Sequence, residues 1–205
     1  MRSSMPTRQW SDFPNKIRAE WLRLLAPLIL SALFVAHAGC TASAPLTALP
    51  FTPEKFFAGE SYSSGTVRTL IVSRQKFTAR FSGDASPGQL NLDERFSFTD
   101  GDRLQRWELR RVADGSYEGT VQTETGDGVL REKRPVRGRL LPDGAVLDYD
   151  GYAPGGGDTL FHFRHRMRAQ ADGTVANRVT ISKFGLPVAT ARVTFTKNST
   201  ELQKP

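Results

Sequence analysis

The sequence predicts an all-β domain, an antiparallel up-and-down meander of about ten strands that forms a barrel or a sandwich and is lipocalin-like in outline. The first observation is a series of turn signals about 13 to 16 residues apart, which leaves room for strands but not for long helices. Aspartate followed by glycine favours a hairpin because glycine accepts the positive φ angles of tight turns. The turn signals are Asp100-Gly101, Asp114-Gly115, Asp127-Gly128, Asp143-Gly144, Gly155-Gly156-Gly157 and Asp172-Gly173.

The second observation is the alternation of apolar and polar side chains between these turns. In the segment 158–170, Phe161, Phe163 and Met167 fall on one face of a strand, together with His165, while arginines fall on the other. An antiparallel sheet packs one face on a core and exposes the other to water. The same alternation elsewhere after residue 58, and the absence of a sustained helical period there, support an all-β domain.

Counting residues outward from two of the turns predicts which residues lie opposite each other in the two hairpins. A two-residue loop at the first Asp-Gly turn would place Glu94 opposite Trp107, with apolar faces matched. At Asp172-Gly173 a two-residue loop would place inward-facing side chains of one strand opposite outward-facing side chains of the other. That hairpin should therefore contain one additional residue, so that Met167 and Val179 point to the same side.

The N-terminal segment has the composition of an export signal. Residues 1–23 carry five basic and two acidic side chains, and residues 24–36 carry no charge. A membrane-spanning helix needs about 20 apolar residues, so this run is short for a permanent span. A basic segment followed by a short apolar core indicates a cleaved secretory signal.

The apolar run ends in Ala38-Gly39-Cys40, which resembles the lipobox of bacterial lipoproteins, although His37 replaces the usual aliphatic residue. The resemblance implies that Cys40 is lipidated after cleavage of the preceding bond and holds the protein on a membrane. Lipidation also accounts for the only cysteine of an exported chain, which has no disulfide partner. By the same resemblance, Thr41 in place of aspartate implies sorting to the periplasmic side of the outer membrane rather than retention at the inner one. The alternative is an ordinary signal peptide that happens to be cut before a cysteine.

The expected organisation is a signal peptide at 1–39, lipidated Cys40 with a tether to residue 58, a β-barrel-like domain at 59–198 and a C-terminal tail at 199–205. The signal carries five of the 28 basic and two of the 21 acidic residues, so cleavage lowers the net charge from +7 to +4. The basic composition is therefore no argument for a nucleic-acid partner, which the exported address also disfavours.

A series of short motifs resembles a known family, the uncharacterised proteobacterial lipoproteins of the domain-of-unknown-function 3833 type. The resemblance covers most of residues 56–196 and rests on the order and spacing of the motifs. It supports the fold and the lipoprotein address, and it implies no activity. The motifs are Phe56-Phe57-Ala58-Gly59, the segment 94–101, Arg106-Trp107, the segment 115–119 and the segment 177–185.

Polar side chains interrupt two apolar strand faces. Alternation points Glu94 inward among leucines and phenylalanines, and Asn177 inward among valines. A buried carboxylate must be paired, protonated or hydrated, because desolvating an isolated charge is costly. We therefore expect Glu94, Trp107, His165 and Asn177 to line an apolar cavity with a few polar points, as in a small-molecule pocket. Structural hydrogen bonds that brace a bent sheet are the alternative.

Arginines dominate the outward faces of the last three predicted strands. If these strands are neighbours, their arginines form a basic face that could rest on anionic lipid headgroups. A solvated outer face is the alternative. The residues are Arg164, Arg166, Arg168, Arg178 and Arg192.

Several kinds of chemistry are disfavoured. His162 and His165 would point to opposite faces of a strand and no cysteine is at hand to complete a site, so no metal site is predicted. The sequence has no Gly-x-Ser-x-Gly nucleophile motif. No helix is expected after Gly155-Gly156-Gly157, which excludes a phosphate loop there. No catalytic residue and no cofactor is predicted.

The sequence favours a non-enzymatic, membrane-tethered domain that binds a hydrophobic or lipid-like ligand or acts in envelope maintenance. One alternative is an enzyme that uses Glu94 or His165 as acid or base on a lipid-derived substrate. Another is a structural envelope protein without a ligand. The barrel interior distinguishes these hypotheses, because a filled core would favour the structural role.

Overall fold

The computed structural model describes residues 51–70 and 73–201. The predicted signal peptide, the lipidation site Cys40 and the first part of the predicted tether lie outside the described residues. Within the described part of the chain, no helix is long and apolar enough to cross a membrane.

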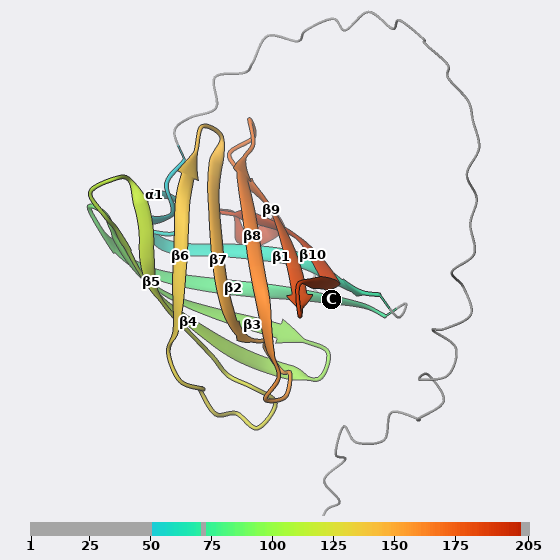
Figure 1. Ribbon diagram of the computed structural model, residues 1–205. Coiled ribbons are helices and arrows are strands. Elements are labelled where there is room, and N and C mark those ends of the chain that lie inside the picture. Colours follow the sequence, from blue (N-terminus) through green and yellow to red (C-terminus); the bar gives the residue numbers. More distant parts are fainter. Residues whose placement is uncertain (1–50, 71–72, 202–205) are drawn as a thin grey trace, which may run out of the picture. The chain divides into compact units, whose positions relative to one another are not determined.

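Ten antiparallel strands close into a barrel (Figure 1). Each strand pairs with its neighbours in sequence, and β10 returns to pair with β1. The predicted up-and-down meander is thus confirmed, and its form is a barrel rather than a sandwich. The strands are β1 (Gly59–Thr69), β2 (Arg74–Ser86), β3 (Gln89–Phe98), β4 (Gly101–Arg111), β5 (Ser116–Thr123), β6 (Arg134–Leu141), β7 (Gly144–Tyr152), β8 (Leu160–Ala169), β9 (Val175–Lys183) and β10 (Leu186–Thr196), with a helix α1 (Pro53–Phe56) before them and a 3-10 turn η3 (Ser199–Glu201) after them.

The Asp-Gly pairs lie at the connections between strands, as predicted. At the β8–β9 connection, Asp172 Oδ1 accepts hydrogen bonds from the Thr174 backbone N–H (2.9 Å) and hydroxyl (2.7 Å), which stabilises the turn. Met167 lies opposite Asn177, so the connection contains the additional residue that the sequence required. Met167 and Val179 are both buried inside the barrel.

The register predicted for the β3–β4 hairpin is wrong by two residues. Phe98 pairs with Gly101, and Glu94 lies opposite Gln105 rather than Trp107. Gly101 has φ +128° and uses its conformational freedom as the first residue of β4 instead of inside the loop. A shift of two residues leaves every side chain on its predicted face, so Glu94 and Trp107 still point inward.

Residues 51–58 pack against one end of the barrel, although the sequence placed them in the tether. Phe51 and Phe57 are buried, and the Phe57 ring centroid lies 5.3 Å from that of Phe81. Glu54 in α1 is 7% exposed and accepts a 2.6 Å hydrogen bond from the Tyr117 hydroxyl. The packed domain therefore includes α1, and we call this end of the barrel the α1 end.

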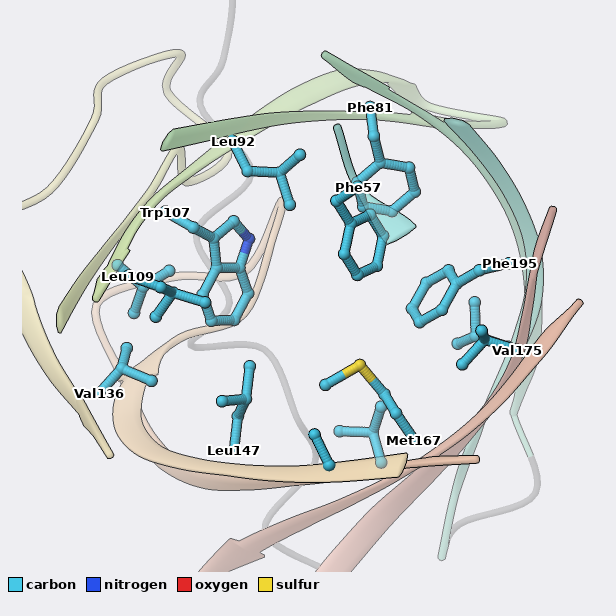
Figure 2. Close-up of a cluster of buried hydrophobic side chains, with 14 of the residues drawn as sticks. Phe57, Phe81, Leu92, Trp107, Leu109, Val136, Leu147, Met167, Val175 and Phe195 are labelled. Carbon is cyan, nitrogen blue, oxygen red and sulfur yellow. The ribbon is translucent and has the colours of Figure 1, made fainter. Parts of the chain in front are cut away.

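The core is a ring of side chains that point inward from the strands (Figure 2). Leu92, Trp107, Leu147, Met167 and Phe195 face one another across the barrel in this view. The end of the barrel opposite α1 is formed by the β1–β2, β3–β4, β5–β6, β7–β8 and β9–β10 connections. We call this end the far rim.

Candidate functional site

A cavity of about 120 Å³ lies inside the barrel. Its wall reaches from Phe57 beside α1 to Pro154 in the β7–β8 connection and is almost entirely apolar. An apolar cavity of about 150 Å³ can hold a molecule the size of benzene. The interior is therefore not completely filled, and it offers room for a small or narrow apolar group.

The four residues predicted to line a pocket all contribute to the wall of this cavity. Glu94 comes from β3, Trp107 from β4, His165 from β8 and Asn177 from β9. Barrel closure brings β3 and β4 across from β8 and β9, so residues far apart in sequence meet at one space (Figure 2).

Glu94 is a buried carboxyl group without a cationic partner among the described residues. Its Oε2 accepts a 3.1 Å hydrogen bond from Trp107 Nε1. Burial raises the pKa of Glu94 to about 8, so the group is largely protonated at neutral pH and carries a hydrogen-bond donor. The nearby Arg106 does not reach Glu94, because it pairs with Asp93 at 2.8 Å on the outer face.

His165 and Asn177 form a second polar pair on the wall. Asn177 Nδ2 lies 3.2 Å from His165 Nδ1. Burial lowers the pKa of His165 to about 4, so the ring is neutral at neutral pH. If the amide donates to Nδ1, the ring proton is on Nε2.

This pair leaves two buried polar atoms without a partner in the described part of the chain. They are His165 Nε2, a donor, and Asn177 Oδ1, an acceptor. The reverse orientation of the amide also leaves one donor and one acceptor. An unsatisfied buried polar group costs about 1–3 kcal/mol. Both atoms are therefore suited to a polar group of a bound molecule.

Polar residues of the interior that the sequence analysis missed include Gln105 and Tyr149. Gln105, which is 2% exposed, donates a 2.8 Å hydrogen bond to the Thr123 hydroxyl. Tyr149 lines the cavity, where its ring stacks on Phe163 with centroids 4.9 Å apart. Alternation could have found Gln105, since it lies two residues before Trp107 and interrupts an inward face as Glu94 does.

The arginines predicted to form a basic face do lie on neighbouring strands, β8, β9 and β10. Two of them have acidic partners: Arg164 pairs with Asp148 at 3.2 Å, and Arg168 pairs with Asp143 at 2.9 Å. Arg166, Arg178 and Arg192 form no ion pair within the described ranges; they lie opposite one another on the three strands. The predicted face is thus two different surfaces, one neutralised and one not.

Among the residues that the structure describes, no group of three His, Cys, Asp or Glu side chains is arranged to hold a metal ion.

The model of a family described as protein of unknown function (DUF3833) matches residues 38–197. The chain belongs to the DUF3833 family. The match starts two residues before Cys40 and extends through the whole barrel of this DUF3833 protein. No curated protein matches the chain.

Proposed function

We propose that this DUF3833 protein is a lipoprotein tethered through Cys40 to the periplasmic side of the outer membrane, whose barrel binds a hydrophobic or lipid-like molecule. The interior cavity supports the binding role, because an apolar wall with few polar points is the usual make-up of a small-molecule site. The Ala38-Gly39-Cys40 motif supports the tether. A filled-core structural protein would not need the cavity.

The polar atoms of the wall restrict the chemistry of the ligand. Glu94 and His165 are both neutral at neutral pH, and the cavity wall contains no lysine or arginine. A charged head group would lose its hydration there without a counter-ion. The site therefore favours a narrow apolar chain with a neutral group that both donates and accepts hydrogen bonds, such as an alcohol or a protonated acid.

Lipid analysis of a cavity-filled variant tests this proposal. Val179 lines the cavity and Ala176 is exposed on the same strand, so Val179→Phe fills the interior while Ala176→Phe adds the same ring outside. Both changes are made in the mature chain carrying Cys40→Ser, which removes the covalent lipid.

Mass spectrometry of organic extracts should find a stoichiometric apolar molecule with the Cys40→Ser and Ala176→Phe proteins and lose it with Val179→Phe. Overpacking costs about 1–3 kcal/mol, so thermal denaturation must first show that the filled variant is folded. The absence of any bound apolar molecule from all three proteins, together with no binding of added fatty alcohol, would falsify the proposal.

A second candidate function is an enzyme acting on a lipid-derived substrate. It is favoured by the opposite pKa shifts of Glu94 and His165 on one cavity wall, a pattern that assigns an acid and a base in known enzymes. In this hypothesis Glu94 is the proton donor and His165 the acceptor. If the protein is an enzyme, the wild type should turn over a bound ester, and Glu94→Gln should abolish this turnover while retaining binding. If it is a binding protein, the wild type should show no turnover.

A further inference from the structure

The outer surface of the barrel has a groove of about 170 Å³ across β1, β2, β9 and β10. It exists because the barrel closes between β1 and β10, which places the first two strands beside the last two. Its wall consists of four arginines and two threonines. They are Thr66, Arg68, Arg74, Arg178, Thr190 and Arg192.

The arginines of this groove face one another across the strands. Arg178 lies directly opposite Arg192, and Arg68 lies directly opposite Arg74. Like charges in directly opposed positions destabilise a sheet. Folding alone therefore does not account for this arrangement.

None of the four arginines has a carboxylate partner within residues 51–70 and 73–201. Strands β9 and β10 contain no acidic residue, and the single acidic residue of β1, Glu60, is bound to Arg80 at 2.7 Å. Several exposed arginines elsewhere on the barrel do have an acidic partner, as Arg110 has Glu118 at 2.7 Å. The groove is thus a concentrated positive site, which a ligand with negative charge would complement.

Exposed apolar side chains lie at the far rim next to the groove. Leu70 follows β1 and is 70% exposed, and Phe184 and Leu186 in the β9–β10 hairpin are 92% and 69% exposed. The Leu70 backbone N–H donates a 3.1 Å hydrogen bond to the Val188 carbonyl, so the two apolar segments are side by side. We call Leu70, Phe184 and Leu186 the apolar tip.

The backbone of Phe184 is strained, in addition to its side chain being exposed. It has φ +52°, followed by Gly185 with φ +77°, which is the geometry of a type I′ turn. Asparagine or glycine is preferred at both positions, and a bulky residue there is strained. Strain and an exposed aromatic ring at one position indicate a functional contact rather than a folding role.

We propose that the arginine groove and the apolar tip together dock this corner of the barrel on an anionic phospholipid bilayer. The guanidinium groups match phosphate oxygens in bidentate geometry, so the groove binds a lipid phosphate. The ring of Phe184 and the side chain of Leu186 enter the interface between head groups and acyl chains. The apolar tip favours a lipid surface over free phosphate, which would use the arginines alone.

Docking in this orientation places the far rim against the bilayer. The lining of the interior cavity reaches the far rim through Phe98, Pro154 and Ile181, so its contents and the membrane would face each other there. The proposal itself stands on the outer surface and does not require that the cavity binds a ligand.

Vesicle sedimentation of the mature chain carrying Cys40→Ser tests the docking site. The protein should bind vesicles of phosphatidylcholine with about 30% phosphatidylglycerol, bind pure phosphatidylcholine at least fivefold more weakly, and lose most of the difference at about 0.5 M salt, where screening is strong. Arg178→Gln with Arg192→Gln should weaken binding to the anionic vesicles at least fivefold. The control, Arg137→Gln with Arg139→Gln on β6, removes the same charge from exposed positions outside the groove and should change binding less than twofold.

The variant Phe184→Asn separates docking from folding. Asparagine suits the positive φ, so the melting temperature should stay level or rise while vesicle binding falls at least threefold. Equal binding to both kinds of vesicle, or equal effects of the two arginine pairs, would overturn the proposal. So would calorimetric binding of inorganic phosphate in the groove without vesicle binding, which would identify a free anion as the ligand.

Discussion

At the scale of single residues, the cavity wall holds two titratable side chains whose pKa values are moved in opposite directions by the same cause. Burial disfavours the charged form of each group, so it raises the pKa of Glu94 to about 8 and lowers that of His165 to about 4. Both groups are then mainly neutral between these values. The wall can therefore form hydrogen bonds without carrying charge. The two pKa shifts can be tested through the pH dependence of the free energy of unfolding.

The first prediction concerns Glu94→Gln. From about pH 4.5 to 8 the folded protein retains a proton on Glu94 that the unfolded chain has released, so its free energy of unfolding falls as pH rises. The glutamine variant has no such proton. At pH 5 the free energy of unfolding of the variant should nearly equal that of the wild type. The variant's advantage over the wild type should then grow by up to about 1.4 kcal/mol per pH unit toward pH 8. Urea titrations at pH 5, 7 and 9 measure this difference, with exposed Glu118→Gln as a control; parallel pH profiles would contradict it.

The second prediction concerns His165→Gln, measured in the Glu94→Gln background to remove the opposing titration. Between about pH 4 and 6.5 the unfolded histidine binds a proton that the folded protein excludes, so the free energy of unfolding rises with pH in this window. Replacing the histidine should flatten that rise. Urea titrations at pH 4.5, 6 and 7.5 provide the test, and an unchanged slope would mean that His165 is protonated in the folded state.

At the scale of elements, α1 closes one end of the barrel through close backbone contact. A side chain at Gly83 would place its Cβ 1.9 Å from the Phe57 carbonyl oxygen, so only glycine lets the segment approach β2. Phe57 then packs on Phe81 and Phe195, with both centroid distances 5.3 Å. The prolines before α1 resemble those of a linker, which is why the sequence analysis assigned these residues to the tether.

The third prediction tests this closure with two Phe→Ala substitutions. Phe57→Ala removes a buried ring, so it should lower the free energy of unfolding by about 3–5 kcal/mol. Phe184→Ala removes an exposed ring and should change it by less than about 0.5 kcal/mol. Denaturant titration compares the two. A cost below about 1 kcal/mol at Phe57 would mean that the segment behaves as a tether.

Strand faces were predictable from the sequence and one strand register was not, for a physical reason. Alternation identified the inward direction of Glu94, Trp107, His165 and Asn177, since a side chain's face depends only on its parity along the strand. A slip of two residues between β3 and β4 preserves that parity, so no local pattern reveals it. The position of the turn decides the register: Phe98 pairs with Gly101, so Thr99 and Asp100 form the two-residue loop.

At the scale of the whole molecule, closure of the barrel creates surfaces that no single strand contains. The groove joins Arg68 and Arg74 to Arg178 and Arg192, residues more than a hundred positions apart, because β1 pairs with β10. The sequence identified only the arginines of the last strands as a basic face. Because a sandwich was the alternative to a barrel, the sequence did not establish that the first strand lies beside the last one.

The whole molecule also sets the distance between the two proposed membrane contacts. Phe51, the first residue that the structure describes, is packed at the α1 end, whereas the proposed docking corner is at the far rim. Phe51 lies eleven residues after Cys40, and a fully extended chain over eleven residue steps spans up to roughly 36–40 Å. An eleven-residue strand such as β1 is about 36 Å long. The tether is therefore long enough for both contacts to be made on one bilayer.

The last prediction is that Cys40→Ser releases the full-length protein from membranes. A lipidated cysteine carries two or three acyl chains, each buried methylene contributing about 0.8 kcal/mol, which makes the anchor stable. The docking corner is screened by salt and contributes far less, so the two contacts respond differently to washing. After a wash with alkaline carbonate, wild-type protein should remain in the membrane fraction and the Cys40→Ser protein should be soluble in the periplasm. Arg178→Gln with Arg192→Gln should leave the wild-type anchor unaffected under the same wash. A Cys40→Ser protein that stays with the membrane after carbonate would refute lipidation as the anchor and would indicate a retained signal segment.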